Sequence, residues 1–465
     1  MNLSRRNFGK LALGSGAAAT LASLGLTSAL AQNAPDEDFK AVVTLFLYGG
    51  NDGWNTLVPM DDDRHRAYSD LRGPTIALEQ RDLAPLSGTN FGMHPSFAPL
   101  VPLWEDNAMS WVLNVGTLQV PLTRDLFWSN PELRPSNLSS HSDEQAHWQS
   151  MRAGSIHPDG VLGRMADLLN SSSAASPLIS TNGANLALMG NKSSPLILPL
   201  YSPFTRGGWD DSWNEAGALR NAALDAFSDG PHPSMVQRLT ADSFKASFKA
   251  GEKMNPILNG EETFIDRFFN ENDNPDGFFR DAQVSRQLRL IARTIEKRGK
   301  LEHSRQIFYA GQGDYDTHAN QVAGGRVLGA HADMLTDVAL SIVSFYKAMK
   351  FLGLENKVTL AVMSDFGRTF KGNGSNGTDH GWGNAHFVIG GGLQPKKIHG
   401  VYPTLDFGGP DDSEQEGTWI PTIANEEYFG SVAKWFGVPD QNMKDVFPNW
   451  AEWQKPGRGI VPLYT

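Results

Sequence analysis

The sequence contains no cysteine among its 465 residues. This absence excludes disulfide bonds, thiolate metal ligands and a cysteine nucleophile. Any metal ion must therefore bind to His, Asp, Glu or Asn side chains, and this donor set favours zinc, manganese, calcium or magnesium.

Positive charge is also scarce. The chain has 40 Lys and Arg residues against 51 Asp and Glu residues, which gives a net charge of -11. Nucleic acids and anionic membranes bind proteins that have an excess of Lys and Arg, so neither is expected as a main partner. No run of about 18 apolar residues follows the N-terminal segment, so we expect no membrane span in the mature protein.

The N-terminal segment has the pattern of an export signal. The stretch SRRNFGK at 4–10 precedes an apolar, small-residue run that ends in Ala29-Leu30-Ala31. We interpret 1–31 as a cleaved twin-arginine signal peptide, with a basic N-terminus or an uncleaved anchor as the alternatives. The expected partner during export is the twin-arginine translocase, and the expected location is the bacterial periplasm or the outside of the cell.

Buried strands are predicted where continuous apolar runs end in small or polar residues. Such runs are typical of parallel strands covered on both faces. They occur at 41–50, 108–116, 305–312, 357–363 and 386–392.

Helical patterns separate several of these runs. The segments 324–353 and 427–437 read as amphipathic helices, and 190–300 reads as a helical insertion or cap. Strands alternating with helices predict a doubly wound α/β fold, with a mostly parallel sheet flanked by helices. We expect 32–465 to form one such domain.

Polar residues follow the predicted strands, where ligands gather in doubly wound sheets. In an extended segment Asp316 and His318 share a face, whereas in a helix Asp314 and His318 do so. Each residue also has a structural interpretation: Asp52 as a turn residue, Asp365 as a helix cap and His380 as a packing residue. Together they predict a metal site, and the side chains concerned are Asp52, Asp316, His318, Asp365, Arg368, Asp379, His380 and His386.

A candidate nucleophile lies in SNLSSHSDEQAHWQS at 136–150. Serines followed by acidic residues are typical of a helix N-terminus, where backbone N–H groups bind anions. Ser140 or Ser142 could attack a phosphorus or sulfur centre, or act as a plain N-cap. His141 and His147 are candidate ligands, groups supporting the ligands, or residues of the helix face.

The motifs together resemble the domain-of-unknown-function family 1501. They are, in order, FLYGGNDGWNTLVP, GMHPSFAPL, SSHSDEQAHW, GDYDTHANQ, SDFGRT and GTDHGWGNAHFVIGGG, and the resemblance extends from about residue 40 to VFPNW near the C-terminus. This family is grouped with the alkaline-phosphatase-like superfamily, which includes phosphatases and sulfatases. The resemblance implies an alkaline-phosphatase-like α/β fold with a two-metal site.

The resemblance also implies roles for particular residues. Asp52 and Asp365 look like the ligands of one metal ion, and Asp316, His318 and His380 like those of the other. Phe366 stands where better-known members have a histidine, and His141, His94 or His386 would have to replace it. Ser140 is the expected nucleophile, and Arg368 the expected contact to the oxyanion.

The expected function is that of an exported, metal-dependent hydrolase of phosphate or sulfate esters. The expected cofactor is one or two divalent ions, zinc or manganese, with calcium as a further option, and the expected substrate is a small-molecule or glycan ester. The alternative is a metal-stabilised, non-catalytic envelope protein that binds glycans or partner proteins. A phosphoryl mutase is a third reading.

Overall fold

The computed structural model describes residues 38–155, 158–169, 176–201, 203–204, 215–258, 260, 262–270 and 281–465. The predicted signal peptide at 1–31 lies outside these residues. No helix in the described part of the chain is long and apolar enough to cross a membrane.

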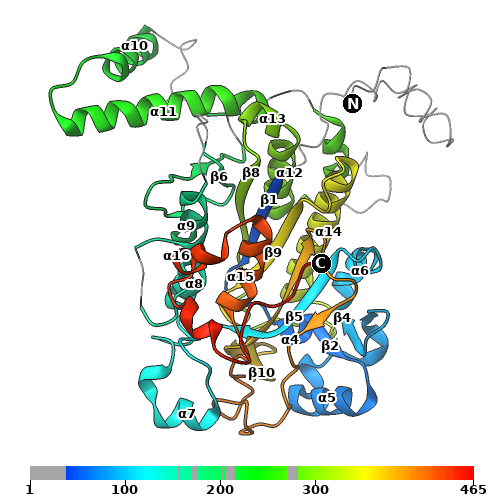
Figure 1. Ribbon diagram of the computed structural model, residues 1–465. Coiled ribbons are helices and arrows are strands. Elements are labelled where there is room, and N and C mark those ends of the chain that lie inside the picture. Colours follow the sequence, from blue (N-terminus) through cyan, green and yellow to red (C-terminus); the bar gives the residue numbers. More distant parts are fainter. Residues whose placement is uncertain are drawn as a thin grey trace, which may run out of the picture.

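A nine-stranded sheet forms the centre of the molecule (Figure 1). Its order is β13-β5-β12-β9-β1-β8-β6-β7, and β14 also pairs with β5. All pairings are parallel except those of β12 with its two neighbours. The strands are β1 (Lys40–Leu47), β5 (Met109–Gly116), β6 (Leu178–Ser180), β7 (Leu196–Ile197), β8 (Arg305–Gln312), β9 (Val358–Ser364), β12 (Asn384–Gly390), β13 (Ile398–His399) and β14 (Ile423–Ala424).

Both faces of this sheet are covered, because β1 divides its side chains between two hydrophobic cores. Val43 and Leu45 belong to one core, and Val42 and Phe46 to the other. This alternation is the period-2 geometry of a strand, here apolar on both faces. The predicted fold class, a mostly parallel α/β sheet flanked by helices, is confirmed.

Helices form the two outer layers. The first core contains residues of α12 (Gln283–Glu296) and α14 (Ala330–Phe351), and the second contains residues of α8 (His141–Ser150), α9 (Val161–Asp167), α15 (Asn425–Phe436) and α16 (Met443–Val446). Further helices are α4 (Gly53–Thr56), α5 (Asp62–Ile76), α6 (Val101–Glu105), α7 (Arg124–Ser129) and α13 (Arg298–Leu301).

The predicted insertion at 190–300 resolves into different parts. Helix α12 packs against β8 and α14, so it belongs to the layer that covers the sheet. Two earlier helices, α10 (Glu215–Asp229) and α11 (Met235–Leu258), instead form an arm that extends away from the sheet (Figure 1).

Two small hairpin sheets complete the structure. One joins β2 (Leu57–Pro59), β3 (Ala84–Pro85) and β4 (Phe91–Met93); the other joins β10 (Arg368–Gly372) and β11 (Thr378–His380). The second hairpin replaces a crossover helix between β9 and β12. Since a parallel connection needs such a crossover, β12 runs antiparallel to β9.

Candidate metal centre

The carboxyl ends of β1, β8 and β9 meet at one edge of the sheet, and the predicted polar residues follow them. Gly49 follows β1, Asp316 and His318 follow β8, and Asp365 follows β9. The β10–β11 hairpin sets Arg368 opposite His380. His141, the first residue of α8, comes from a distant part of the sequence.

Three histidines converge on one carboxylate oxygen. Oδ1 of Asp316 lies 3.1 Å from Nε2 of His318 and 3.3 Å from Nε2 of both His141 and His380. The Nε2 atoms of His318 and His380 are 2.9 Å apart. Ligand atoms of His141, Asp316 and His380 all lie within 4.8 Å of one another, and within the described residues this is the one group of three or more potential ligands so arranged.

The opposite nitrogen of each ring is engaged by an oxygen acceptor. Nδ1 of His141 lies 2.7 Å from Oδ2 of Asp365, and Nδ1 of His318 lies 2.7 Å from Oδ1 of Asp379. Nδ1 of His380 lies 2.7 Å from the carbonyl oxygen of Ser139. An acceptor at Nδ1 favours the Nδ1–H tautomer, which leaves the Nε2 lone pair free.

This donor set fits a divalent cation. Three Nε2 lone pairs directed at a carboxylate oxygen repel one another unless a positive charge lies between them. Nε2 of His141 is buried and without a hydrogen bond of its own. Ligand atoms about 2.0–2.1 Å from a tetrahedral zinc ion are about 3.3 Å apart, close to the contacts of 2.9–3.3 Å found here.

The donor types narrow the choice of ion. Imidazole nitrogens suit zinc, carboxylate oxygens suit manganese, and calcium takes six to eight oxygen ligands. The site therefore favours the zinc or manganese prediction over calcium.

Arg368 holds Asp316 in its ionised form. The guanidinium donates to Oδ1 of Asp316 at 2.8 Å and to the carbonyl of Gly49 at 3.2 Å. Burial alone would raise the pKa of Asp316, but the hydrogen bond and charge of Arg368 outweigh it and lower this pKa to about 2. The other donors of Arg368 bind Thr378, and its side chain has no exposed surface. Arg368 thus positions a ligand, which corrects the prediction that it contacts the oxyanion.

Asp365 supports a ligand, in contrast to its predicted role as one. Its Oδ1 accepts the Gly49 N–H at 3.2 Å, and its Oδ2 lies against His141 and accepts from Gln145 at 2.9 Å. The side chain is fully buried. The hydrogen bond to Asp365 raises the pKa of His141.

Asp52 lies in a separate buried network. It forms an ion pair with Arg72 in which neither side chain is exposed. Its Oδ1 also accepts the Asn55 N–H at 3.2 Å, which caps α4, and its Oδ2 accepts from Gln321 at 2.7 Å. Because its charge is neutralised by a guanidinium inside the protein, we remove Asp52 from the ligand set.

The position left by the expected histidine is filled by Phe366. Its ring centroid lies 4.8 Å from those of both His141 and His380. Of the three proposed replacements, His141 alone joins the cluster. His94 caps the helix at 95–100 by accepting the Ser96 N–H, and His386 is buried against Trp148.

Ser140 and Ser142 border the cluster without pointing a free hydroxyl at it. Ser140 donates to the Asp143 side chain at 2.6 Å, and Ser142 lies 3.2 Å from the Ser140 hydroxyl. The main chain at this point does contribute, because the Ser139 carbonyl contacts His380. Ser139 adopts a φ of 73°, which is unusual for a residue with a side chain and is often found at functional sites.

Two residues support the ligands, and of these only Asp379 was among the predicted site residues. Asp379 holds His318, and Gln145 holds Asp365. Asp379 directly precedes His380 in the sequence, and this adjacency indicates that it lies near the site. The role of Gln145 is recognisable only once α8 is placed against the end of β9.

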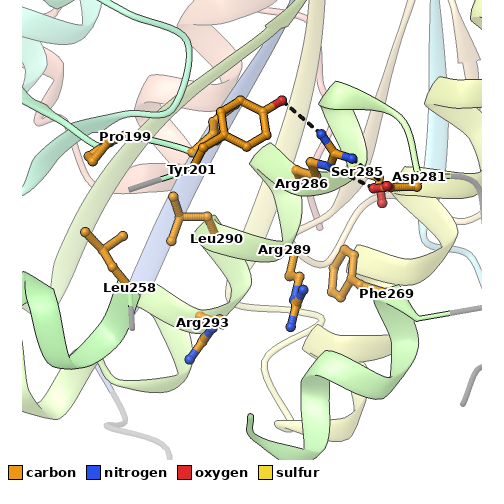
Figure 2. A pocket seen from close by; sticks show the side chains of 11 residues that line it. Pro199, Tyr201, Leu258, Phe269, Asp281, Ser285, Arg286, Arg289, Leu290 and Arg293 are labelled. Carbon is orange, nitrogen blue, oxygen red and sulfur yellow. Dashed lines mark hydrogen bonds and ion pairs between the residues drawn. The ribbon is translucent and has the colours of Figure 1, made fainter. Parts of the chain in front are cut away.

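A separate cavity of about 420 Å³ lies beside α12 (Figure 2). Three arginines of this helix line it, and three carboxylates balance them: Asp281 pairs with Arg286, Glu262 with Arg289, and Asp266 with both Arg289 and Arg293. None of the lining residues belongs to the histidine cluster. The paired charges leave no net positive potential, so we assign this cavity no ligand.

Comparison with known proteins supports the predicted family resemblance over part of the chain. Residues 267–414 match the model of a family described as a protein of unknown function, DUF1501. This match includes Asp316, His318, Asp365, Asp379 and His380. No curated protein matches the sequence.

Three solved structures are similar to this chain at low identity. The structure of Ps i-CgsB in complex with k-i-k-neocarrahexaose has a TM-score of 0.34 and 10% identity, over 89% of this chain and 76% of that one. A mutant of the alkaline phosphatase PafA has a TM-score of 0.26 and 11% identity, over 72% and 64%. A putative sulfatase from Bacteroides thetaiotaomicron has a TM-score of 0.29 and 12% identity, over 91% and 76%. These scores are too low to assign an activity.

Proposed function

We propose that the protein is a metal-dependent hydrolase of phosphate or sulfate esters that uses one divalent ion, zinc or manganese. The observation that carries this proposal is the convergence of three imidazole Nε2 atoms on Asp316, with each Nδ1 held by an oxygen acceptor. A bound ion would polarise the ester oxygen and lower the pKa of a coordinated water.

The residues of the chain have distinct parts in this scheme. His141, Asp316 and His380 would hold the ion and would leave the fourth position of a tetrahedral ion for water or the ester, while His318 lies against Asp316. Asp365, Asp379 and the Ser139 carbonyl keep the imidazoles in the tautomer that binds metal, and Arg368 keeps Asp316 ionised. The side chains of Asp316 and His318 are each 45% exposed, so an ester can reach this side of the cluster.

Ser140 remains the proposed nucleophile, on the basis of its position between two residues that contact the cluster. To attack, its hydroxyl must leave the Asp143 side chain. A Ser140→Ala variant separates this route from direct attack by water, because the second route keeps its rate when the hydroxyl is lost.

Metal content tests the proposal. We expect about one equivalent of zinc or manganese by mass spectrometry of the purified protein, and loss of this ion in His380→Ala and Asp316→Asn. His65→Ala is the matched control, because His65 bonds to the Leu78 carbonyl away from the cluster. A protein without stoichiometric metal, or an unchanged content in His380→Ala, contradicts the proposal.

Turnover separates catalysis from the non-catalytic alternative. We expect hydrolysis of a nitrophenyl phosphate or sulfate that falls at least about 100-fold in His380→Ala. A metal-loaded protein that is inactive on phosphate and sulfate esters, and that retains glycans or envelope proteins in pull-downs, would instead fit the metal-stabilised binding protein.

We further propose that the protein is exported by the twin-arginine translocase and works in the periplasm or outside the cell. The support is the sequence pattern at 1–31. A reporter fused to 1–40 should leave the cytoplasm, and replacement of Arg5 and Arg6 by Lys should retain it there. Export that persists after this replacement would argue against the translocase.

A further inference from the structure

The arm formed by α10 and α11 is held to the body at one end. Ala250, Met254 and Ile257 of α11 are buried, and Met254 and Ile257 belong to the core that also contains α12. Nearer the turn between the helices, Phe227 of α10 packs on Phe244 of α11 with ring centroids 6.2 Å apart. The rest of the arm projects from the molecule (Figure 1).

The projecting part exposes large apolar side chains. Leu219 is 72% exposed, Met235 68%, Val236 71% and Leu239 56%. Small residues continue this surface, because Ala216, Ala223, Ala226 and Ala246 are also exposed. Exposed apolar residues that gather on one element mark an interaction surface more often than residues scattered singly.

The two helices carry opposite charge biases. Helix α10 has three acidic residues and one basic residue, whereas α11 has four basic residues and two acidic ones. The arm is therefore neutral as a whole, although the chain has a net charge of -11. Two copies of this acidic chain repel each other through their bodies, and this repulsion is weakest at the arm because the arm has no net charge.

We propose that this arm is a self-association surface whose partner is a second copy of this chain. In a two-fold arrangement α10 of one copy lies against α11 of the other, so that the acidic helix meets the basic one twice and the apolar side chains of both copies are buried together. The product is a four-helix bundle.

The size of the apolar surface of the arm determines the expected affinity of the dimer. A helix of 15 residues is about 22 Å long, and two helices side by side are about 20 Å wide. A face of several hundred Å² per copy falls at the low end of specific interfaces. We therefore expect a dimer with a dissociation constant in the micromolar range.

Sedimentation equilibrium of the purified chain tests this. We expect a monomer–dimer equilibrium between about 1 and about 200 µM, and at least about tenfold weaker association in Leu239→Glu. Val401→Glu is the matched control, because Val401 is 67% exposed and lies outside the arm. Raising salt from about 50 to about 500 mM should weaken the dimer, since the charge complementarity is exposed to solvent.

The absence of cysteine permits a second test that does not require a destabilising charge. In Leu239→Cys the introduced thiol is the only one in the chain, so a bismaleimide linker can join two chains only through this position. We expect cross-linked dimer with Leu239→Cys and little with Val401→Cys. A monomer at about 200 µM, a dimer unaffected by Leu239→Glu, or an arm that binds neutral lipid vesicles while the protein stays monomeric would overturn the proposal.

Metal content and ester hydrolysis are read in the same variants. Both should be unchanged in Leu239→Glu, because no residue of the arm contacts the histidine cluster in the described structure. The proposal of self-association and the proposal of hydrolase activity are thus tested by separate measurements, and either one can be contradicted without the other.

Discussion

The candidate metal centre depends on which nitrogen of each histidine is free. Asp365, Asp379 and the Ser139 carbonyl each occupy an Nδ1 atom, and the Nε2 atoms then face Asp316. Outer partners of this kind typically change metal affinity 10–100-fold when removed. An aspartate thus serves as a candidate ligand at Asp316 and supports a ligand at Asp365. The two roles differ because Asp316 faces the Nε2 atoms of the histidines, whereas Asp365 contacts Nδ1 of His141.

Asp52→Asn should destabilise the protein without removing its metal. The substitution leaves the Arg72 guanidinium buried and unpaired, which costs about 3–5 kcal/mol. Urea unfolding measures the loss, and mass spectrometry measures the metal. Loss of metal with normal stability would return Asp52 to the ligand set.

Glu426 should make stability depend on pH. It is buried on α15, where burial raises its pKa to about 8. In the unfolded chain Glu426 has its ordinary pKa of 4.5, so between this pKa and the folded one the folded state binds more protons, and stability falls as pH rises from about 4.5 to about 8.

Glu426→Gln tests this directly. The amide still accepts the Trp453 N–H but cannot ionise, so the variant should be more stable than the parent at pH 8, by on the order of 3 kcal/mol, and similar to it near pH 5. Unfolding midpoints across this range provide the measurement. Parallel pH profiles for parent and variant would show that Glu426 does not titrate between these values.

At the scale of elements, the loop after β1 positions the cluster through its backbone. Gly49 donates its N–H to Asp365, and its carbonyl accepts from Arg368. Its φ is 110°, and an added Cβ would lie 2.4 Å from the backbone nitrogen of Asp316. No residue with a side chain fits this position without displacing the ligand loop.

Gly49→Ala should therefore weaken metal binding about tenfold and lower stability by about 1–3 kcal/mol. Zinc titration calorimetry and urea unfolding provide the two readouts. Gly313→Ala is the control, because an added Cβ there meets nothing within 4 Å and the loop is the same one that carries Asp316. Equal zinc affinities in Gly49→Ala and Gly313→Ala would show that the loop carrying Asp316 tolerates the displacement by the added Cβ.

For the whole molecule, the bound ion should link metal to folding. A ligand at 100 times its dissociation constant stabilises the native state by about 2.7 kcal/mol, provided that the unfolded chain does not bind it. A chelator should lower the melting temperature by a few degrees, and added zinc should restore it. Asp316→Asn should show neither change, and a parent protein that is indifferent to chelation would count against a site that stabilises the fold.

Much of this molecule was predictable from residue patterns alone. Continuous apolar runs of the right length located β1, β5, β8, β9 and β12 to within two or three residues, because strands covered on both faces need apolar side chains at every position. The direction of β12 was not predictable from its own residues. It depends on the β10–β11 hairpin, which is too short to cross the sheet.

The sequence by itself determined the chemistry available to the protein: no thiolates, a limited set of histidines and carboxylates, and polar residues after buried strands. The tertiary structure decided which of them meet. It brought His141 from a distant helix to Asp316, turned Asp365 toward His141, and paired Asp52 with Arg72. The two contacts of His141 join residues that are far apart in the chain, 224 residues in the case of Asp365, and local periodicity carries no information on such long-range geometry.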